Sequence, residues 1–230
     1  GLLESGRAAK GLVVVETHAD RAELIGDRFG VRVTDSIADA IVGADVLVIA
    51  VKPGDVDTVL TQLGKAELDA DRDQILVSLA AGVPTARLEN KLPAGFPVVR
   101  VMSNTPMLVG QGMSVLAPGR YARPEQLSQV TELLAAVGKV ATVTEAQMDA
   151  VTAVSGSGPA YFFLVVEAMV DAGVGLGLTH DVATELVVQT MLGSAALLES
   201  SGQTAAELRA AVTSPAGTTR ARPRGLETGA

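Results

Sequence analysis

The segment Ser155–Pro159, with the sequence SGSGP, combines residue types that can bind an anion through the main chain. Gly156 and Gly158 permit backbone conformations that are closed to other residues, and they let another group approach closely. Pro159 suits the first turn of the long apolar helix expected after it. We therefore expect a helix that stops at Ser155 and a ring of unpaired N–H groups that could hold a carboxylate or phosphate. On these residues alone, a plain corner between two helices is the simpler interpretation.

A second turn, Thr213–Thr219, has the sequence TSPAGTT and a similar character. Its residues are small, several carry hydroxyl groups, and one is a proline, so the two turns could converge on one anion. The alternative is that this turn only caps a following helix.

Several kinds of chemistry are excluded by composition. The chain has no cysteine, which rules out disulfides, thiolate catalysis and cysteine-ligated zinc. Its two histidines, His18 and His180, cannot form a histidine-rich metal cage, so we expect no metal site. The net charge of −8 argues against a broad nucleic-acid surface.

We also expect a soluble, cytoplasmic protein. Glu167 interrupts the best candidate for a membrane-spanning apolar run, which favours a protein that does not enter a membrane. The first residues, GLLESGR, lack the pattern of a signal peptide. Because the chain starts at Gly1 and residues 2–5 resemble the tail of a helix, we expect an earlier segment to be missing.

Strands alternate with helices in the first half of the chain, which predicts an α/β, Rossmann-type parallel sheet domain over residues 1–144. The expected strands are residues 12–15, 31–33, 46–51, 75–79, 98–102, 113–117 and 140–143. The expected helices are residues 19–29, 36–42, 56–63, 85–91 and 124–136. The strands at 12–15 and 46–51 are continuous apolar runs, which is typical of strands buried on both faces.

Ligands bind at the carboxyl ends of the strands in such a sheet. Here those ends carry Glu16, Val51-Lys52-Pro53, Ala80-Ala81-Gly82 and Asn104-Thr105-Pro106. Glu16 occupies the place where a dinucleotide fold puts the acid that bonds a ribose hydroxyl, although a solvated acid at a strand end is the simpler interpretation. The G-x-G-x-x-G loop that should precede such an acid is not in these 230 residues, so we expect it in the missing segment.

The second half, residues 145–230, is predicted to be an all-helical domain, with helices at 145–154, 159–172, 180–200 and 204–212. The helix 159–172 is apolar nearly all round and is therefore expected to be buried. From this we predict an obligate homodimer built on residues 159–200.

Six motifs occur in one order along the chain: AVKP (50–53), SLAAGV (78–83), SNTP (103–106), DAVTAVSGSGPAYFF (149–163), DAGVGLGL (171–178) and AVTSPAGTT (211–219). Together they resemble pyrroline-5-carboxylate reductase over essentially the whole chain. The resemblance implies a nicotinamide-binding domain, a helical dimerisation domain, and reduction of L-1-pyrroline-5-carboxylate to L-proline, the last step of proline biosynthesis. NADPH or NADH would be the cofactor, and the other partners would be the small-molecule substrate and a second copy of the chain.

The same resemblance assigns roles to residues. It implies cofactor contacts by Ala50, Val51, Lys52, Pro53, Leu79, Ala80 and Ala81, to which the strand ends add Glu16 and Asn104. It implies substrate contacts by Glu145, Ser155, Gly156, Ser157, Gly158, Thr218 and Thr219. Hydride transfer to a C=N carbon needs no covalent nucleophile. The resemblance places Thr219 at the substrate, and its hydroxyl can hydrogen-bond the imine nitrogen, so we expect it to be the catalytic residue.

The chain departs from the family pattern in three places. The glycine loop is absent, Ala211 replaces a polar residue, and RARPRGLETGA after Thr219 departs from the small and apolar residues of the family, whose closing helix is missing too. Two alternatives stay open. One is another reductase with a helical second domain, such as a 3-hydroxyacid dehydrogenase, which would use a lysine that this chain lacks after Lys139. The other is a non-catalytic fragment that dimerises through its helices.

Overall fold

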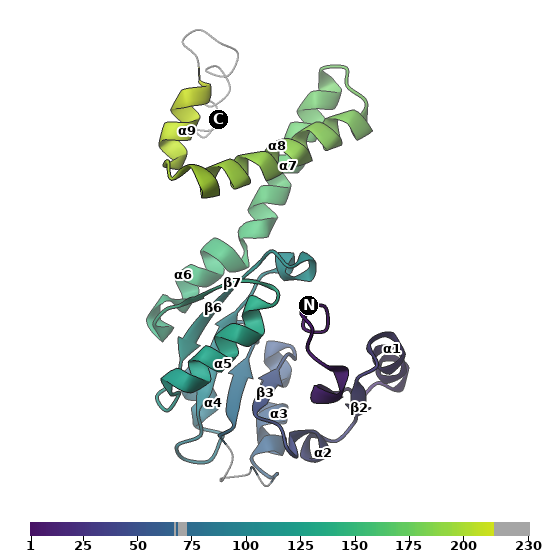
Figure 1. Cartoon of the computed structure of the whole chain (residues 1–230), viewed down its shortest axis with the longest axis vertical. Helices are drawn as coiled ribbons and strands as arrows, with labels where there is room; N and C mark the ends of the chain where they lie inside the picture. The colour runs from purple at the N-terminus through teal and green to yellow at the C-terminus, as the bar shows by residue number, and fades with distance from the viewer. Residues whose placement is uncertain (67, 69–72, 214–230) are drawn as a thin grey trace. The chain divides into compact units, whose positions relative to one another are not determined.

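A computed structural model describes residues 1–66, 68 and 73–213 of the chain (Figure 1). The chain divides into two compact units, residues 1–160 and 161–230. The strands are β1 (Val13–Val15), β2 (Arg32–Thr34), β3 (Val46–Ile49), β4 (Ile75–Ser78), β5 (Val98–Met102), β6 (Gly112–Pro118) and β7 (Gly138–Thr142). The helices of the first unit are α1 (Ala19–Phe29), α2 (Ile37–Ile41), α3 (Val56–Leu63), α4 (Thr85–Glu89), α5 (Pro124–Ala135) and α6 (Met148–Val151).

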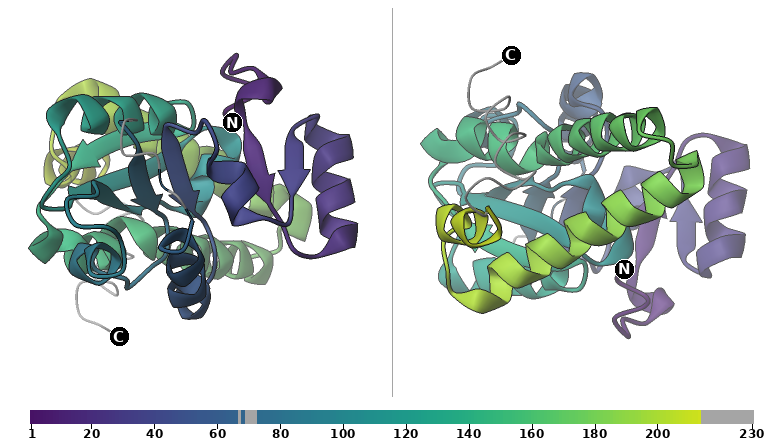
Figure 2. Two further views of the ribbon diagram at one scale, coloured as in Figure 1. Left: turned by 90° about the horizontal axis from the view of Figure 1, so that it is seen from below. Right: turned by 90° about the horizontal axis from the view of Figure 1, so that it is seen from above.

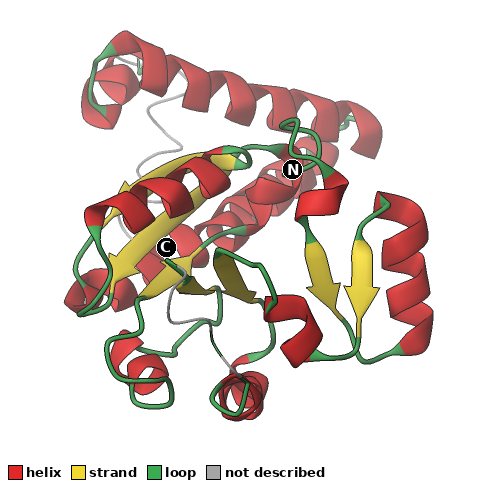
Figure 3. Cartoon of the chain, turned by 60° about the horizontal axis from the view of Figure 1, so that its bottom comes forward, coloured by secondary structure: helices red, strands yellow, loops and turns green. Residues whose placement is uncertain are grey.

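The first unit confirms the α/β prediction, with two differences in the sheet. The order β3-β4-β5-β6-β7 forms one five-stranded sheet, whereas β1 and β2 form a separate parallel pair flanked by α1 (Figure 2, Figure 3). The strands β5 and β6 pair antiparallel, and every other pair is parallel. Their connection, residues 103–111, is shorter than the dozen or so residues that a parallel crossover needs.

Apolar side chains from alternate strand positions pack against helices on both faces of the five-stranded sheet. Leu47, Leu76 and Val98 pack with the helices α2, α3 and α4 in one cluster. Val77, Val99 and Val101 belong to a second cluster with the helix α5. A third, small cluster joins Met102 of β5 to Met148 of α6.

The strands β1 and β3 are less buried than their apolar sequences predict. Val13 and Val15 are each 38% exposed, and Val48 is 48% exposed. Both strands lie at the edge of their sheets and have a neighbouring strand on one side only. The prediction that both faces of these strands are covered is therefore wrong for the chain as described.

The second unit is helical, with α7 (Gly158–Gly175) entering it and α8 (His180–Ser201) and α9 (Ala205–Val212) following. The helices α7 and α8 pack through a small cluster of Val166, Val170, Ala183 and Val187. The ends of α8 follow sequence signals, since the Thr179 side chain caps its first turn and Gly202 ends it at a φ of 67°.

The helix α7 is not buried within the chain, contrary to the prediction. Tyr161, Phe162, Phe163 and Leu164 are 56%, 62%, 60% and 64% exposed. A helix that is apolar all round but packs against a single neighbour must leave most of its apolar surface uncovered.

Two helical stretches, residues 145–175 and 180–201, are long and apolar enough to cross a membrane, judged by length and composition alone. The prediction that Glu167 prevents this is therefore wrong. The helical stretch continues across the glycine turn, and one acid lowers the mean hydropathy of a long window only slightly.

Candidate functional site at the carboxyl ends of the strands

The first part of the site is formed by the ends of β3 and β4. Ile49 pairs with Ser78, and the Leu79 amide donates a hydrogen bond of 2.9 Å to the Ile49 carbonyl. Residues 50–53 therefore lie next to residues 79–81 at one edge of the sheet. Ala50, Val51, Lys52 and Pro53 are exposed there, Leu79 is half-buried, Ala80 is buried and Ala81 is exposed.

This edge fits a dinucleotide. It is lined by small or apolar side chains and by one exposed cation, Lys52, and the chain turns sharply at Gly82, whose φ is 73°. A flat ring can lie against such side chains, and the ammonium group offers positive charge to a phosphate.

Asn104 follows β5 at the same edge, because β5 pairs with β4 through Arg100 and Ser78. Its side-chain amide is engaged at both ends. The Oδ1 atom accepts a hydrogen bond of 2.8 Å from the Met113 amide, and Nδ2 donates one of 3.0 Å to the Ser155 carbonyl. Asn104 thus links the edge of the sheet to the SGSGP segment.

Glu16 ends β1, as predicted, and its carboxylate is surrounded by local donors. Oε1 lies 3.0 Å from both the backbone amide and the ring Nδ1 of His18, and Oε2 lies 3.5 Å from Nε of Arg21. The hydrogen bonds from the His18 backbone and ring, followed by the charge of Arg21, lower the pKa of Glu16. The acid is therefore ionised at neutral pH and can accept hydrogen bonds.

The SGSGP segment does not stop the preceding helix, which corrects the prediction made from its sequence. Residues Thr152–Gly156 form a π-helical turn that leads into α7. The Ser157 amide donates a hydrogen bond of 2.8 Å to the Thr152 carbonyl, so the expected ring of unpaired N–H groups is not complete. This bond joins residues five apart, which is the spacing of a π turn.

Gly156 lies in close contact with Met102 rather than in an unusual backbone conformation. Its φ is not positive, but a Cβ added to it would overlap the Cε atom of Met102. Gly158 differs, since an added Cβ would meet nothing within 4 Å. One of the two glycines therefore has a packing reason in the described structure.

Glu145 begins a 3-10 turn (Glu145–Gln147) and pairs with a residue that the sequence reasoning missed. Its Oε1 atom lies 2.5 Å from Nη1 of Arg100, whose side chain is only 6% exposed. Its Oε2 atom is buried and has no hydrogen-bond partner among the described residues. A lone arginine inside the apolar strand VVRVM was the signal that could have pointed to this pair.

Thr218 and Thr219 lie outside the described residues. Only Thr213 of the second turn is described, and its hydroxyl donates a hydrogen bond of 2.6 Å to the Arg209 carbonyl at the end of α9. The convergence of the two turns on one anion stays a prediction.

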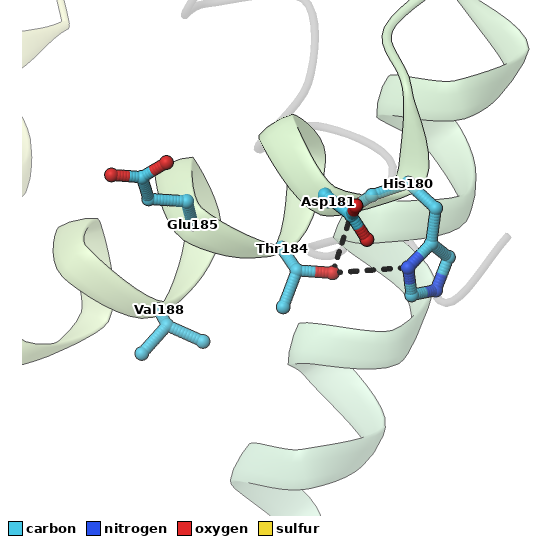
Figure 4. Close-up of a pocket in the computed structure, with 5 residues that line it drawn as sticks. All are labelled: His180, Asp181, Thr184, Glu185 and Val188. Atoms are coloured by element: carbon cyan, nitrogen blue, oxygen red, sulfur yellow. Dashed lines mark hydrogen bonds between the residues drawn. The ribbon is translucent and has the colours of Figure 1, made fainter.

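A shallow depression on α8 is lined by His180, Asp181, Thr184, Glu185 and Val188 (Figure 4). The Thr184 hydroxyl lies 3.4 Å from the His180 ring and donates to the His180 carbonyl at 2.8 Å. All five residues come from one helix, and none belongs to the predicted site. Convergent groups from several elements, which mark a binding site, are therefore lacking here.

The comparisons with known proteins agree with this arrangement. A family model described as "Pyrroline-5-carboxylate reductase dimerisation" matches residues 145–230, and one described as "NADP oxidoreductase coenzyme F420-dependent" matches residues 1–82. A pyrroline-5-carboxylate reductase of Mycobacterium tuberculosis is 52% identical to the chain and is matched over 100% of this chain and 84% of its own length.

Two solved structures of pyrroline-5-carboxylate reductases are also similar to the chain. A pyrroline-5-carboxylate reductase from Coxiella burnetii is 34% identical, with a TM-score of 0.91 over 99% of this chain and 84% of its own. A Plasmodium falciparum pyrroline carboxylate reductase with NADP bound is 30% identical, with a TM-score of 0.79 over 86% of this chain and 74% of its own.

Proposed function

This chain belongs to the pyrroline-5-carboxylate reductase family, and we propose how its residues divide the work of that reaction. It is an oxidoreductase that reduces L-1-pyrroline-5-carboxylate to L-proline with NADPH or NADH, the last step of proline biosynthesis. The identity of 52% over the full chain disfavours a different reductase or a purely non-catalytic role.

The ends of β3 and β4 are the cofactor side of the proposed site. When bound, the nicotinamide supplies the hydride that reduces the C=N carbon. Residues 50–53 and 79–81 provide the surface on which it is oriented, and their hydrogen-bonded strand ends keep that surface rigid. Glu16 accepts hydrogen bonds from the ribose of the adenosine part.

The segment from Glu145 to Gly158 is the proposed substrate side. Ser157 is exposed there, and its hydroxyl is suited to a carboxylate. Glu145 has one oxygen held by Arg100 and another without a partner among the described residues, so it can accept a hydrogen bond from a substrate amine. The family match adds Thr218 and Thr219, and it gives Thr219 the contact with the imine nitrogen.

We further propose that the active form is a homodimer built on residues 159–200 and that it acts in the cytoplasm. The exposed aromatic residues Tyr161–Phe163 indicate that an apolar surface of a partner covers them. In a symmetric homodimer the two copies cover this surface on each other. The match of residues 145–230 to a dimerisation model favours this over a membrane. The proposed boundary between the cofactor-binding domain and the helical domain lies between residues 144 and 145.

The single observation that carries the proposal is the link from the cofactor edge to the SGSGP segment through Asn104 and Ser155. The test is oxidation of NADPH or NADH by the purified protein, followed by absorbance with and without L-1-pyrroline-5-carboxylate, together with detection of L-proline. Cofactor binding is measured separately by quenching of nicotinamide fluorescence. Binding without substrate-dependent oxidation, or no binding at all, would contradict the proposal and favour a non-catalytic role.

A further inference from the structure

Three residues at alternate positions along β5 and the turn after it hold the segment that leads to the glycine turn. They are Arg100, Met102 and Asn104. Alternation places the first two on one face of β5, and Asn104 lies two residues beyond its end. Their partners lie far along the chain. Arg100 pairs with Glu145, Met102 lies against Gly156, and Asn104 binds Ser155.

Asn104 is the member of this row whose geometry is most specific. An amide presents an acceptor on one side and a donor on the other, and here each side meets the complementary group. The Met113 amide donates to Oδ1 at 2.8 Å, and the Ser155 carbonyl accepts from Nδ2 at 3.0 Å. A carboxylate of the same shape could satisfy the first contact but not the second.

The Ser155 carbonyl lies inside the π-helical turn Thr152–Gly156. Such turns occur mostly as single, local departures from α-helical hydrogen bonding. A donor from outside the helix, fixed at its other end on β6, therefore ties this turn to the sheet. Gly156 and Ser157 follow directly, so the same contact sets where their main chain lies.

We propose that Asn104 is a positioning residue for hydride transfer, which holds the main chain of residues 155–158 in place relative to the strand ends that carry the cofactor. This rests on the proposed function, because it requires substrate at residues 155–158 and cofactor at residues 50–53 and 79–81. Asn104 then acts through Ser155, and this role replaces the contact with the cofactor that its place at a strand end led us to expect.

The discriminating variant is Asn104→Asp, which keeps the acceptor for the Met113 amide and turns the Nδ2 donor into an oxygen that repels the Ser155 carbonyl. A misplacement of about 1 Å can cost about 10²-fold in rate. We expect kcat to fall at least about tenfold while KM for the cofactor stays within about twofold. The isotope effect with deuterated cofactor should rise, because the transfer step becomes slower relative to product release.

The matched control is Ser103→Ala, the neighbouring residue, whose hydroxyl contacts the Ser114 hydroxyl at 3.1 Å. It should leave kcat and the isotope effect unchanged. Amide hydrogen exchange gives a readout that does not depend on activity. Asn104→Asp should speed exchange at residues 155–158, and Ser103→Ala should not.

The outcomes distinguish the positioning role of Asn104 from the proposed function of the protein. Unchanged kcat per folded molecule, or a rise in cofactor KM alone, would overturn the positioning role, and the second result would make Asn104 a cofactor ligand. An inactive wild-type protein would instead count against the proposed function. If Asn104→Asp does not fold, Asn104→Ser removes both contacts without adding a charge and must show the same split between kcat and KM.

Discussion

Arg100 and Glu145 form an ion pair with 2.5 Å between Nη1 and Oε1, although 45 residues separate them in the sequence. The arginine side chain is 6% exposed and the glutamate side chain 31% exposed, so the two charges differ in their access to water. A buried guanidinium requires a compensating charge, because its desolvation is otherwise not offset. The pair therefore fixes the start of the segment that leads to the glycine turn.

Removing the glutamate should be more damaging than removing the arginine. Glu145→Gln leaves a buried guanidinium without its counter-charge, which should lower the free energy of unfolding by about 3 kcal/mol. Arg100→Met fills the same space with apolar atoms and leaves a glutamate side chain that is 31% exposed, against 6% for the arginine, so it should cost less. Urea unfolding of both single variants and the double variant tests this. Equal and strictly additive losses would show that the pair is not coupled.

The two glycines of the SGSGP segment should respond differently to alanine. Gly156→Ala forces the terminal methyl group of Met102 to move, and because this group ends a flexible side chain the loss should lie at the low end of the roughly 1–3 kcal/mol typical of overpacking. Gly158→Ala is the matched control, since its Cβ meets no atom within 4 Å. Thermal unfolding should show a loss for the first variant that Met102→Ala partly reverses. A comparable loss in both variants would contradict a specific contact with Met102.

Glu16 should influence the choice between NADH and NADPH. An ionised acid at this place repels a 2′-phosphate, so Glu16→Ser should raise the ratio of kcat/KM for NADPH to that for NADH. Glu23→Ser removes the same charge from a position in α1 and should leave the ratio unchanged. If both variants behave alike, Glu16 acts only through net charge.

The hydrogen bonds from His18 should keep this preference constant between neutral and mildly acidic pH. They lower the pKa of Glu16, so its charge persists below the ordinary carboxylate range and is lost only as the pH falls through the lowered pKa. Between neutral and mildly acidic pH, Glu16 should therefore stay ionised and should cause no change in the ratio of kcat/KM for NADPH to that for NADH. Steady-state kinetics with both cofactors over this range checks the point.

The sequence predicted the elements of the first unit well because local signals and packing agree. Residues 19–29 form α1 with the bounds expected from periodicity and from Gly30, whose φ is 64°. The Asp39 amide donates to the Ser36 side chain, which caps the first turn of α2. The strand ends lie together because parallel neighbours share an edge.

The errors arise where a long-range contact overrides a local pattern. The sequence SGSGP predicts the end of a helix, but the chain forms a π turn there. Asn104 and Met102 contact this turn from β5 and the residues after it, and periodicity alone cannot predict such contacts. Arg100 was missed because its partner is distant in sequence. The exposed faces of β1, β3 and α7 depend on neighbours that a hydrophobic run does not identify.

The apolar surface of α7 should govern the oligomeric state. Leu164 on α7 and Leu24 on α1 are 64% and 62% exposed, so they are a matched pair of exposed leucines. If a second copy covers α7, Leu164→Asp loses about 1.5–3 kcal/mol of apolar burial and adds a desolvated charge. Sedimentation velocity should then show dissociation for Leu164→Asp and not for Leu24→Asp. A folded wild-type monomer at micromolar concentration, or binding to lipid vesicles that Leu164→Asp abolishes, would contradict the homodimer.

Substitution of Thr219 should lower the rate of catalysis without lowering the stability of the protein. As the imine is reduced, its nitrogen becomes a basic amine, and a hydroxyl can serve both states because it donates and accepts. Losing one such contact in a desolvated site typically costs about 10²–10³ in rate, whereas losing a helix cap costs about 1 kcal/mol of stability. Thr219→Ala should therefore cut kcat at least about tenfold with little change in Tm, and Thr219→Ser should recover most of it. Thr213→Ala is the control, because the Thr213 hydroxyl binds the Arg209 carbonyl and should affect only stability. Early melting of Thr219→Ala with normal turnover per folded molecule would make Thr219 a cap and remove the catalytic role proposed for it.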